Sequence, residues 1–315
     1  MFITASTVDD LLHEVFEKLI QKGKVINPTR GEALELIGVL LELKNPRARV
    51  SRTETRGRMF SSLGELLWYL SKTNDLAFIC YYLKDYETDS EDGQTIYGGY
   101  GPRLFRKNGK IDQVKNILKL LKERPNSRRA VIQLFDAEDI VKDRKEIPCT
   151  CTMQFLIRRG KLDMFTCMRS NDAFLGLSHD IFAFTMLQEI MARSLNVKLG
   201  RYKHAVGSLH LYKDREKAAK QYLDEGWQSK VPMPSMPKGD PWPSIKVLLD
   251  AESDIRNDRE TKISTLNLSP YWADLLRLLQ IYARYSAGRA KDKASIERLK
   301  QEMSSDVYMT YIERR

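Results

Sequence analysis

At the centre of the chain stands Ile147-Pro148-Cys149-Thr150-Cys151-Thr152-Met153-Gln154-Phe155, followed by Met168-Arg169-Ser170-Asn171-Asp172 and by Gly176-Leu177-Ser178-His179-Asp180. These segments place a thiol after a proline, then an arginine, then a further acid beyond a glycine turn. A thiol can attack an electrophilic carbon, a guanidinium group can bind a phosphate, and a carboxyl group can read the edge of a heterocycle. The pattern therefore predicts an enzyme that acts on a nucleotide.

The composition is that of a folded protein with an excess of positive charge. The 315 residues are 42% hydrophobic and 30% charged, and the formal net charge is +10. The lysines are spread along the chain among acids, so this charge favours a bound phosphate over a nucleic-acid partner. No apolar run is long enough to cross a bilayer, and residues 1–20 lack the core of a signal peptide. We therefore expect a cytoplasmic protein without a membrane partner.

The cysteine pattern does not indicate a disulfide framework or a metal site. Four cysteines occur, Cys80, Cys149, Cys151 and Cys167, and the only close pair is Cys149-x-Cys151. No second pair with the spacing of metal ligands accompanies it. We expect reduced thiols and no metal, with Cys151 on a strand and pointing away from the thiol of Cys149 or inward.

Apolar periodicity predicts helices and strands without a dividing linker. Thr7 caps the first helix, which ends near Gly23, and residues 151–158 and 162–168 form a hairpin. The apolar residues 181–195 are too many for a strand and predict a buried helix. The other expected elements are strands at 34–43, 130–135 and 204–212, helices at 114–121, 215–226, 271–286 and 294–303, and a proline-rich crossing at 231–244. We expect one α+β domain over residues 1–315, with a helical extension from about residue 250.

Two features between residues 62 and 101 bear on function. Ser62-Leu63-Gly64-Glu65 has the spacing of a capping box ahead of an apolar helix, so Glu65 is either a helix cap or a functional carboxylate. Residues 86–101 are acidic and rich in glycine, which predicts a loop. Loops of this length are often functional.

Five segments together resemble the thymidylate synthase superfamily, which includes the pyrimidine-nucleotide hydroxymethylases. They are Glu65-Leu-Leu-Trp-Tyr-Leu, Ser127-Arg128-Arg129, Pro148-Cys149 with Gln154-Phe155, Arg169-Ser170-Asn171-Asp172-x-x-Leu-Gly-Leu, and Gly207-Ser-Leu-His210-Leu-Tyr212. The match runs from about Glu65 to Tyr212 and is loose elsewhere. The resemblance implies a twisted mixed β-sheet flanked by helices, and a homodimer in which two sheets pack against each other.

The resemblance also implies a phosphate site that two subunits share. Arg169 and Ser170 belong to one subunit, whereas Arg128 and Arg129 come from its neighbour, so that activity requires the dimer. Several planar guanidinium groups suit the dianion of a nucleoside monophosphate, because each can pair with two oxygens. Arg30 takes the place of a further phosphate-binding arginine on a mobile segment.

Cys149 takes the place of the family's nucleophile, which adds to C6 of the pyrimidine and makes C5 able to attack a one-carbon donor. The thiolate is the reactive form, and neighbouring arginines are expected to lower the pKa of the thiol. The resemblance implies 5,10-methylenetetrahydrofolate as the co-substrate, with Asp172 as the candidate that binds its pterin. Glu65 is the candidate that organises water and protons around the base, a role that suits a carboxylate whose pKa is raised by burial.

Four further residues are carried over from the family's motifs. His210 and Tyr212, on one face of a strand, are the candidates for the sugar 3′-hydroxyl. Tyr100 is the candidate for the active-site tyrosine, with Tyr97 as the second choice. Gln154 is a further candidate for substrate binding.

Asp180 is the sharpest departure from the synthases. These carry asparagine at this position, whose amide donates to O4 of uracil and accepts from N3–H. A carboxyl group instead accepts from the N4 amino group of cytosine and donates a proton to N3. An ionised Asp180 facing O4 of uracil would press two acceptors together, which costs a few kcal/mol. Asp180 therefore predicts a cytosine nucleotide.

In having an acid at this position, the chain resembles the dCMP hydroxymethylase branch of the family. In that branch water, rather than hydride, captures the methylene group formed on the base. The chain's four tryptophans, Trp68, Trp227, Trp242 and Trp272, all lie outside residues 80–105, where the synthases use tryptophan to shield the intermediate. We therefore expect a 5-hydroxymethyltransferase acting on dCMP or CMP. Ser170 and the family favour the deoxyribose form.

Three further positions differ from the synthases. Thr150 replaces a histidine common after the nucleophile, Ser208 replaces an acid common before the ribose-reading histidine, and the end of the chain, Tyr311-Ile312-Glu313-Arg314-Arg315, lacks the synthases' apolar terminus. Closure of the terminus over the folate is therefore left open. The alternatives are a thymidylate synthase that methylates dUMP, and a non-catalytic dimer that uses this fold to bind nucleic acid.

Overall fold

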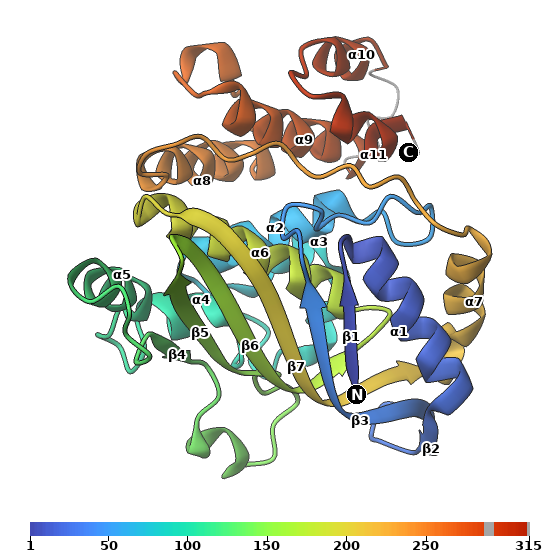
Figure 1. The fold of residues 1–315 in the computed structure, drawn as a ribbon. Helices are drawn as coiled ribbons and strands as arrows, with labels where there is room; N and C mark the ends of the chain where they lie inside the picture. The colour runs from blue at the N-terminus through green and yellow to red at the C-terminus, as the bar shows by residue number, and fades with distance from the viewer. Residues whose placement is uncertain (287–292, 314–315) are drawn as a thin grey trace.

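The computed structural model describes residues 1–286 and 293–313, which form a mixed seven-stranded sheet flanked by helices (Figure 1). Its strand order is β1-β3-β7-β6-β5-β4, with β2 beside β3. The parallel pairing of β6 with β7 and the antiparallel pairing of β3 with β7 place the chain's longest strands at the centre. The strands are β1 (Phe2–Ala5), β2 (Lys24–Ile26), β3 (Ala33–Leu43), β4 (Val131–Gln133), β5 (Thr150–Arg158), β6 (Lys161–Asp172) and β7 (Lys198–Tyr212). The expected α+β fold with a mixed sheet is confirmed.

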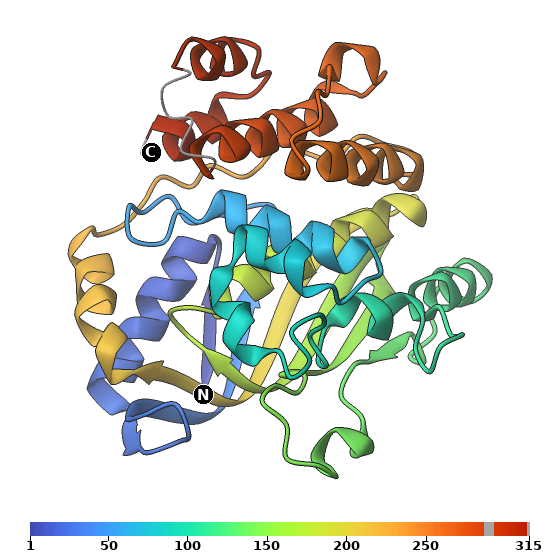
Figure 2. The same cartoon turned by 180° about the vertical axis from the view of Figure 1, so that it is seen from behind.

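Helices cover one face of this sheet. Figures 1 and 2 show α2, α3, α4 and α6 behind the sheet, while no described helix crosses the front of β3, β7, β6 and β5. The helices are α1 (Val8–Lys22), α2 (Met59–Leu70), α3 (Leu76–Tyr82), α4 (Tyr100–Phe105), α5 (Gln113–Glu123), α6 (Leu177–Ser194), α7 (Glu216–Asp224), α8 (Trp242–Arg256), α9 (Pro270–Ser286), α10 (Lys293–Gln301) and α11 (Met309–Glu313). None of these described helices has both the length and the apolar character needed to cross a membrane.

Local sequence signals account for several of these elements. Thr7 caps α1, its side chain accepting the backbone N–H of Asp10 at 3.0 Å. The β5–β6 hairpin turns at Arg159 and Gly160, whose φ angles of 51° and 70° lie in the left-handed region that such two-residue turns require. Helix α6 is buried along most of its length, as its nearly continuous apolar sequence predicts.

Two expectations about local structure are wrong. Helix α2 begins at Met59, so Ser62 and Glu65 lie inside the helix and do not form a capping box. The apolar Met59 and Phe60 are buried and extend the helix backwards, which excludes the interpretation of Glu65 as a cap. The proline-rich crossing ends at Pro241 instead of residue 244, because Trp242-Pro243 opens α8, where proline is tolerated at the first turn. The sequence pattern therefore did not predict helix α8.

The C-terminal helices α8 to α11 pack above the end of the sheet (Figure 1), and one apolar cluster includes side chains from both α1 and α9. The single domain over residues 1–315 with a helical extension stays a prediction. Beneath the extension, the fully buried Arg49 forms an ion pair with Glu189 of α6. Glu189 also accepts the backbone N–H of Met236 at 3.0 Å, so the pair fixes the crossing segment to the core. Arg314 and Arg315 lie outside the described residues.

Replacing Glu189 with glutamine should leave the guanidinium of Arg49 buried without a compensating charge. We expect the free energy of unfolding to fall by about 3 kcal/mol, measured by urea denaturation. The matched control is Asp250→Asn, which removes one partner of the exposed Lys246–Asp250 pair on α8 and should change stability little. Equal losses in the two variants would contradict the structural role of the buried pair.

Candidate active site

Cys149 lies immediately before β5, where Arg169 of the neighbouring strand β6 holds it. The guanidinium of Arg169 donates from Nε to the carbonyl oxygen of Pro148 at 3.0 Å and from Nη2 to that of Ile147 at 3.0 Å. Its Nη2 is also 3.6 Å from Sγ of Cys149, and its backbone N–H donates to the Cys149 carbonyl at 2.9 Å. The predicted nucleophile and the predicted phosphate arginine are therefore in direct contact.

The electrostatics of Cys149 within one subunit oppose ionisation. The pKa of the thiol is raised to about 11, chiefly by burial and also by the nearby acids Glu146 and Asp180, although the cations of Arg169 and Arg30 lower it. The arginines therefore act on the thiol in the expected direction, but the net pKa is raised, contrary to the expectation that they lower it. Further positive charge is needed to make the thiolate abundant at neutral pH.

Glu65 projects from the middle of α2 into a buried, tyrosine-lined position. One carboxylate oxygen, Oε1, accepts the hydroxyl of Tyr69 at 2.7 Å and that of Tyr86 at 2.9 Å. Burial raises the pKa of Glu65, and the two hydroxyl donors partly offset that rise. This environment fits the expected raised pKa of a catalytic carboxylate.

Asp180 lies in the first turn of α6 and is held by Asn171 of β6. The amide Nδ2 of Asn171 donates to Oδ2 of Asp180 at 2.6 Å. Burial raises the pKa of Asp180 well above its usual range, and the charge of Glu65 raises it further. A neutral Asp180 offers one donor and one acceptor to a bound base.

Tyr100 begins α4 and is bonded to the residue that follows the nucleophile. Its hydroxyl donates to Oγ1 of Thr150 at 2.9 Å and accepts the backbone N–H of Thr150 at 3.0 Å. The hydroxyl of Tyr97, the second choice, instead donates to Asp139 at 2.9 Å, and its ring lies against the guanidinium of Arg144. The structure thus brings Tyr100, and not Tyr97, to the strand that follows Cys149.

The proposed sugar- and folate-binding residues lie on adjacent strands. The rings of His210 and Tyr212 on β7 are 5.0 Å apart, and the strand register pairs His210 with Asp172 and Ser208 with Ser170. One oxygen of Asp172, Oδ1, accepts the backbone N–H groups of Phe174 and Leu175 at 2.8 Å each. Its Oδ2 makes no hydrogen bond among the described residues, so it can serve a ligand such as a pterin, which presents N–H donors.

The other phosphate candidates lie further from Cys149. Arg30 is exposed and pairs with Asp89 at 2.5 Å, and its charge acts on both Cys149 and Tyr212. Arg128 and Arg129 lie on the turn before β4, and within residues 1–286 and 293–313 their exposed side chains make no hydrogen bond or ion pair. Gln154 lies apart from Cys149, its amide donating to the Arg128 carbonyl at 2.9 Å, so it contacts the arginine turn.

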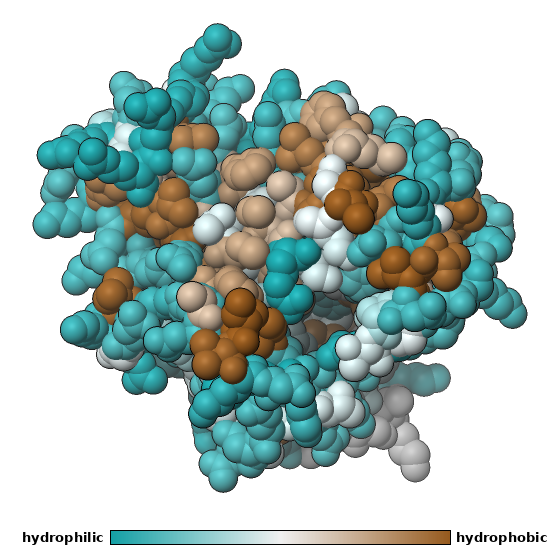
Figure 3. All heavy atoms as spheres, turned by 90° about the horizontal axis from the view of Figure 1, so that it is seen from below, coloured by the Kyte–Doolittle hydropathy of each residue, from teal (hydrophilic) through white to brown (hydrophobic). Residues whose placement is uncertain are grey.

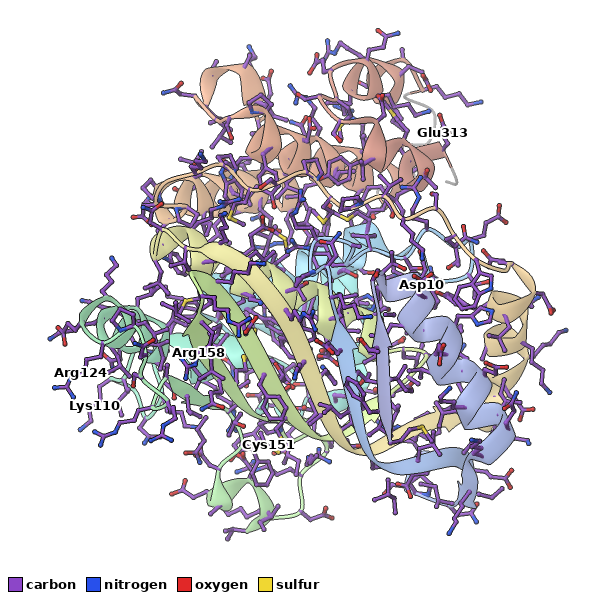
Figure 4. The ribbon with its side chains drawn as sticks, in the orientation of Figure 1. Asp10, Lys110, Arg124, Cys151, Arg158 and Glu313 are labelled. Atoms are coloured by element: carbon purple, nitrogen blue, oxygen red, sulfur yellow. The ribbon has the colours of Figure 1, made fainter. Side chains whose placement is uncertain are left out.

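Contrary to expectation, the basic residues are not evenly spread along the chain but are enriched between residues 103 and 129. Residues 103–129 hold ten lysines and arginines and only two acids, and this segment ends at Arg128 and Arg129. Lys110 and Arg124 of this segment lie on the outer side of α5 in Figure 4. The positive charge is therefore concentrated next to the turn that carries the proposed phosphate donors.

All four cysteines are unpaired, and the part of the chain that is described holds no cluster of metal-ligating side chains. Cys151 lies on β5 at the end of the sheet nearest the Cys149 segment (Figure 4). Figure 3 looks onto that end of the molecule, where polar and apolar side chains border a recess.

Sequence reasoning missed several residues that build this site. Tyr69 and Tyr86 hold Glu65, Asn171 holds Asp180, and Thr150 holds Tyr100. The buried Arg56 donates to the Leu175 carbonyl at 3.1 Å and to Oγ of Ser178 at 2.8 Å, which fixes the turn between Asp172 and Asp180. Two of these contacts had a local signal, since Glu65 and Tyr69 belong to one quoted motif and Asn171 and Asp180 are nine residues apart in adjoining motifs.

The site geometry agrees with a comparison of the whole chain. A family model described as thymidylate synthase matches residues 12–244. The chain belongs to the thymidylate synthase family. Members of this family bind a nucleoside monophosphate and use methylenetetrahydrofolate as co-substrate.

Two curated relatives of this thymidylate synthase family chain carry the same description. A "Deoxyuridylate hydroxymethyltransferase" of Bacillus phage SP01 is 30% identical over 224 residues, which cover 67% of this chain and 58% of the relative. A protein of the same description from Pseudomonas phage M6 is 34% identical over 158 residues, covering 49% of this chain and 45% of the relative. The chain therefore spans about half the length of the curated relatives it matches.

Replacing Arg169 with glutamine should raise the pKa of Cys149, because the nearest cation is lost. We expect alkylation of Cys149 by iodoacetamide at pH 8 to slow about tenfold, corresponding to one pKa unit, as measured on the Cys149 peptide by mass spectrometry. Arg158→Gln, which removes an exposed arginine bonded only to its neighbouring carbonyl, serves as the control. An unchanged rate in Arg169→Gln would show that its charge does not act on the thiol.

Proposed function

We propose that the chain is a pyrimidine nucleotide 5-hydroxymethyltransferase, with dCMP favoured over CMP. The carrying observation is that the site combines the Cys149–Arg169 contact with Asp180 in place of the synthases' asparagine. Methylenetetrahydrofolate, when bound, supplies the one-carbon unit, and Asp172 is our candidate to bind its pterin. The relatives' description as hydroxymethyltransferases supports the same reaction class.

The chain's own side chains divide the chemistry between them. Cys149 adds through sulfur to C6 of the base, which places electron density on C5. Arg169, Ser170 and Arg30 bind the phosphate, and His210 with Tyr212 binds the sugar hydroxyl. Fixing the two ends of the nucleotide in this way places C6 at the thiol.

Asp180 reads the base as a neutral acid. Because Asn171 already donates to Oδ2, this oxygen acts as an acceptor and the proton resides on Oδ1. An acceptor and a donor side by side match the N4 amino group and the unprotonated N3 of cytosine. Burial raises the pKa of Asp180 well above its usual range, which favours this neutral form.

A second candidate substrate is dUMP, which the names of both relatives favour. A neutral carboxyl group can also pair with uracil if its hydroxyl faces O4 and its carbonyl oxygen faces N3–H. The two candidates therefore differ in which carboxyl oxygen faces the 4-substituent of the base. They share the nucleophile, the phosphate site and the capture of a methylene by water.

Asp180→Asn should move base preference towards uracil, since asparagine is the residue that the synthases carry at this position to donate to O4 of uracil and accept from N3–H. We expect the ratio of kcat/KM for dCMP over dUMP to fall about a hundredfold, measured with the two nucleotides in parallel and the products identified by mass. Wild-type protein that turns over dUMP alone would contradict the cytosine assignment and select the second candidate.

We further propose a homodimer in which the uncovered sheet faces pack together. Ile37 on β3, one of the strands with no described helix in front of them, is 79% exposed in the single chain. Arg128 and Arg129 have no partner within the described residues of their own chain, which suits donation to a neighbour's phosphate site. Their charge would also supply the cations that Cys149 lacks in one subunit.

Co-expression of two inactive variants tests whether active sites are shared. Cys149→Ser and the double variant Arg128→Glu/Arg129→Glu should each be inactive, whereas their mixed dimer has one intact site, giving about a quarter of wild-type activity overall. Cys149→Ser with Arg169→Ala is the control, because both defects lie in the same subunit's site and no mixed site is intact. Restoration in the control, or none in the test pair, would contradict sharing.

A further inference from the structure

Tyr86 reaches Glu65 from a separate segment of the chain. It lies on the 3₁₀ turn η1 (Lys84–Asp89), whereas Glu65 and its other donor, Tyr69, belong to α2. The Tyr86 hydroxyl is 2.9 Å from Oε1 of Glu65, and its ring packs edge-on against Trp68 with centroids 5.5 Å apart. Tyr86 thus joins the loop of residues 84–99 to the buried carboxylate.

The hydrogen bonds at Glu65 are asymmetric. Both tyrosine hydroxyls donate to Oε1, while Oε2 makes no hydrogen bond among the described residues. Burial raises the pKa of Tyr86 well above its usual range, so the phenol stays protonated and acts as a donor. Two donors on one oxygen fix the rotation of the carboxylate and leave Oε2 available to a ligand.

The loop that carries Tyr86 is attached to the segment that leads into the nucleophile. Lys145 donates to the carbonyl oxygen of Ser90 at 2.9 Å, and Arg144 pairs with Glu91 at 3.1 Å. Glu146 accepts the backbone N–H of Gly98 at 3.0 Å. The position of Tyr86 is therefore tied to the residues directly before Cys149.

We propose that Tyr86 is a positioning residue that holds Glu65 with Oε2 towards the substrate, so that Oε2 accepts a proton from the water that captures the methylene group. This inference rests on the proposed hydroxymethyltransferase function, and it assigns to Tyr86 a part in the capture of the methylene group by water. Tyr69 lies one turn further along α2, the helix that carries Glu65 itself. Among the described residues, only Tyr86 therefore holds the carboxylate from another segment of the chain.

The step balances as follows. The water oxygen bonds to the exocyclic methylene carbon on C5, the π electrons of that double bond move into the ring, and one water proton passes to Oε2 of Glu65. The bond between C6 and the sulfur of Cys149 then breaks, which restores the C5–C6 double bond and releases the thiolate. No oxidant or reductant is consumed, so the water-derived hydroxyl stays in the product.

This role requires an ionised Glu65, and its surroundings set how much is ionised. Burial is the main influence and raises its pKa, whereas the Tyr69 and Tyr86 hydroxyls lower it. Asp180 from α6 is coupled to the Glu65 charge, and Glu146 and Tyr100 act on Tyr86. Removing the Tyr86 hydroxyl therefore raises the pKa of Glu65 further.

Tyr86→Phe tests the proposal through the pH dependence of turnover. Activity that needs ionised Glu65 rises with pH through the pKa of that group, so the acidic limb of the kcat profile should move to higher pH by about one unit. At a pH on the acidic limb we expect kcat to fall about tenfold with little change in the KM for the nucleotide. Tyr69→Phe should shift the limb in the same direction.

Tyr81→Phe is the matched control, since Tyr81 lies one turn before η1 and packs against Tyr82 and Tyr282, away from Glu65. A kcat profile of Tyr86→Phe that superimposes on wild type, or that Tyr81→Phe reproduces, would overturn the positioning role. Wild-type protein that forms no hydroxymethylated nucleotide would instead overturn the proposed function. The two failures are thus distinguished by the wild-type product.

Discussion

The contact between Arg169 and the segment Ile147-Pro148-Cys149 is the constraint on which the site depends. One guanidinium bonds two successive carbonyl oxygens and touches the thiol, so the arginine that is expected to hold the phosphate also holds the nucleophile. A planar fork with several donors can make these contacts together, which an ammonium group cannot. The distance between nucleophile and phosphate anchor is therefore fixed by the pairing of β5 with β6.

Burial then sets the protonation of the groups around this contact. The pKa of Cys149, Glu65 and Asp180 is raised in each case, chiefly because the charged form is removed from water. For Asp180 the result is useful, since a neutral acid can donate to a base. For Cys149 the raised pKa disfavours the reactive thiolate, and in the proposed dimer the partner's arginines would lower that pKa. The same physical effect thus suits the proposed base reading, and in the proposed dimer it would be offset by the partner's arginines.

Local sequence patterns predicted the elements whose structure is determined locally. The hairpin followed from residues that accept left-handed φ angles, α1 from its cap, and α6 from a long apolar run. The capping-box interpretation of Glu65 was wrong because burial of Met59 and Phe60 extends α2 by tertiary packing. No local signal indicates where a helix gains such support.

In the site, too, residues within short motifs could be predicted, whereas contacts made only through the fold could not. Cys149, Arg169 and Asp180 lie in short motifs, which is why the sequence indicated them. The pairing of β5 with β6 brings Cys149 to Arg169, and Asn171 of β6 holds Asp180. Tyr86 could not be paired with Glu65 from the sequence, because they are separated by 21 residues and meet only through the fold. In the proposed dimer Arg128 and Arg129 would reach a phosphate only across the subunit interface, which the sequence of one chain does not determine.

Capture of the methylene group by water is the central claim, and the origin of the product's oxygen tests it most directly. The reaction would be run with dCMP, dUMP and methylenetetrahydrofolate in water enriched in ¹⁸O, and the nucleotide products weighed by mass spectrometry. A 5-hydroxymethyl nucleotide that carries ¹⁸O, formed without dihydrofolate, is the predicted result. A 5-methyl nucleotide without the label, formed together with dihydrofolate, would contradict the account.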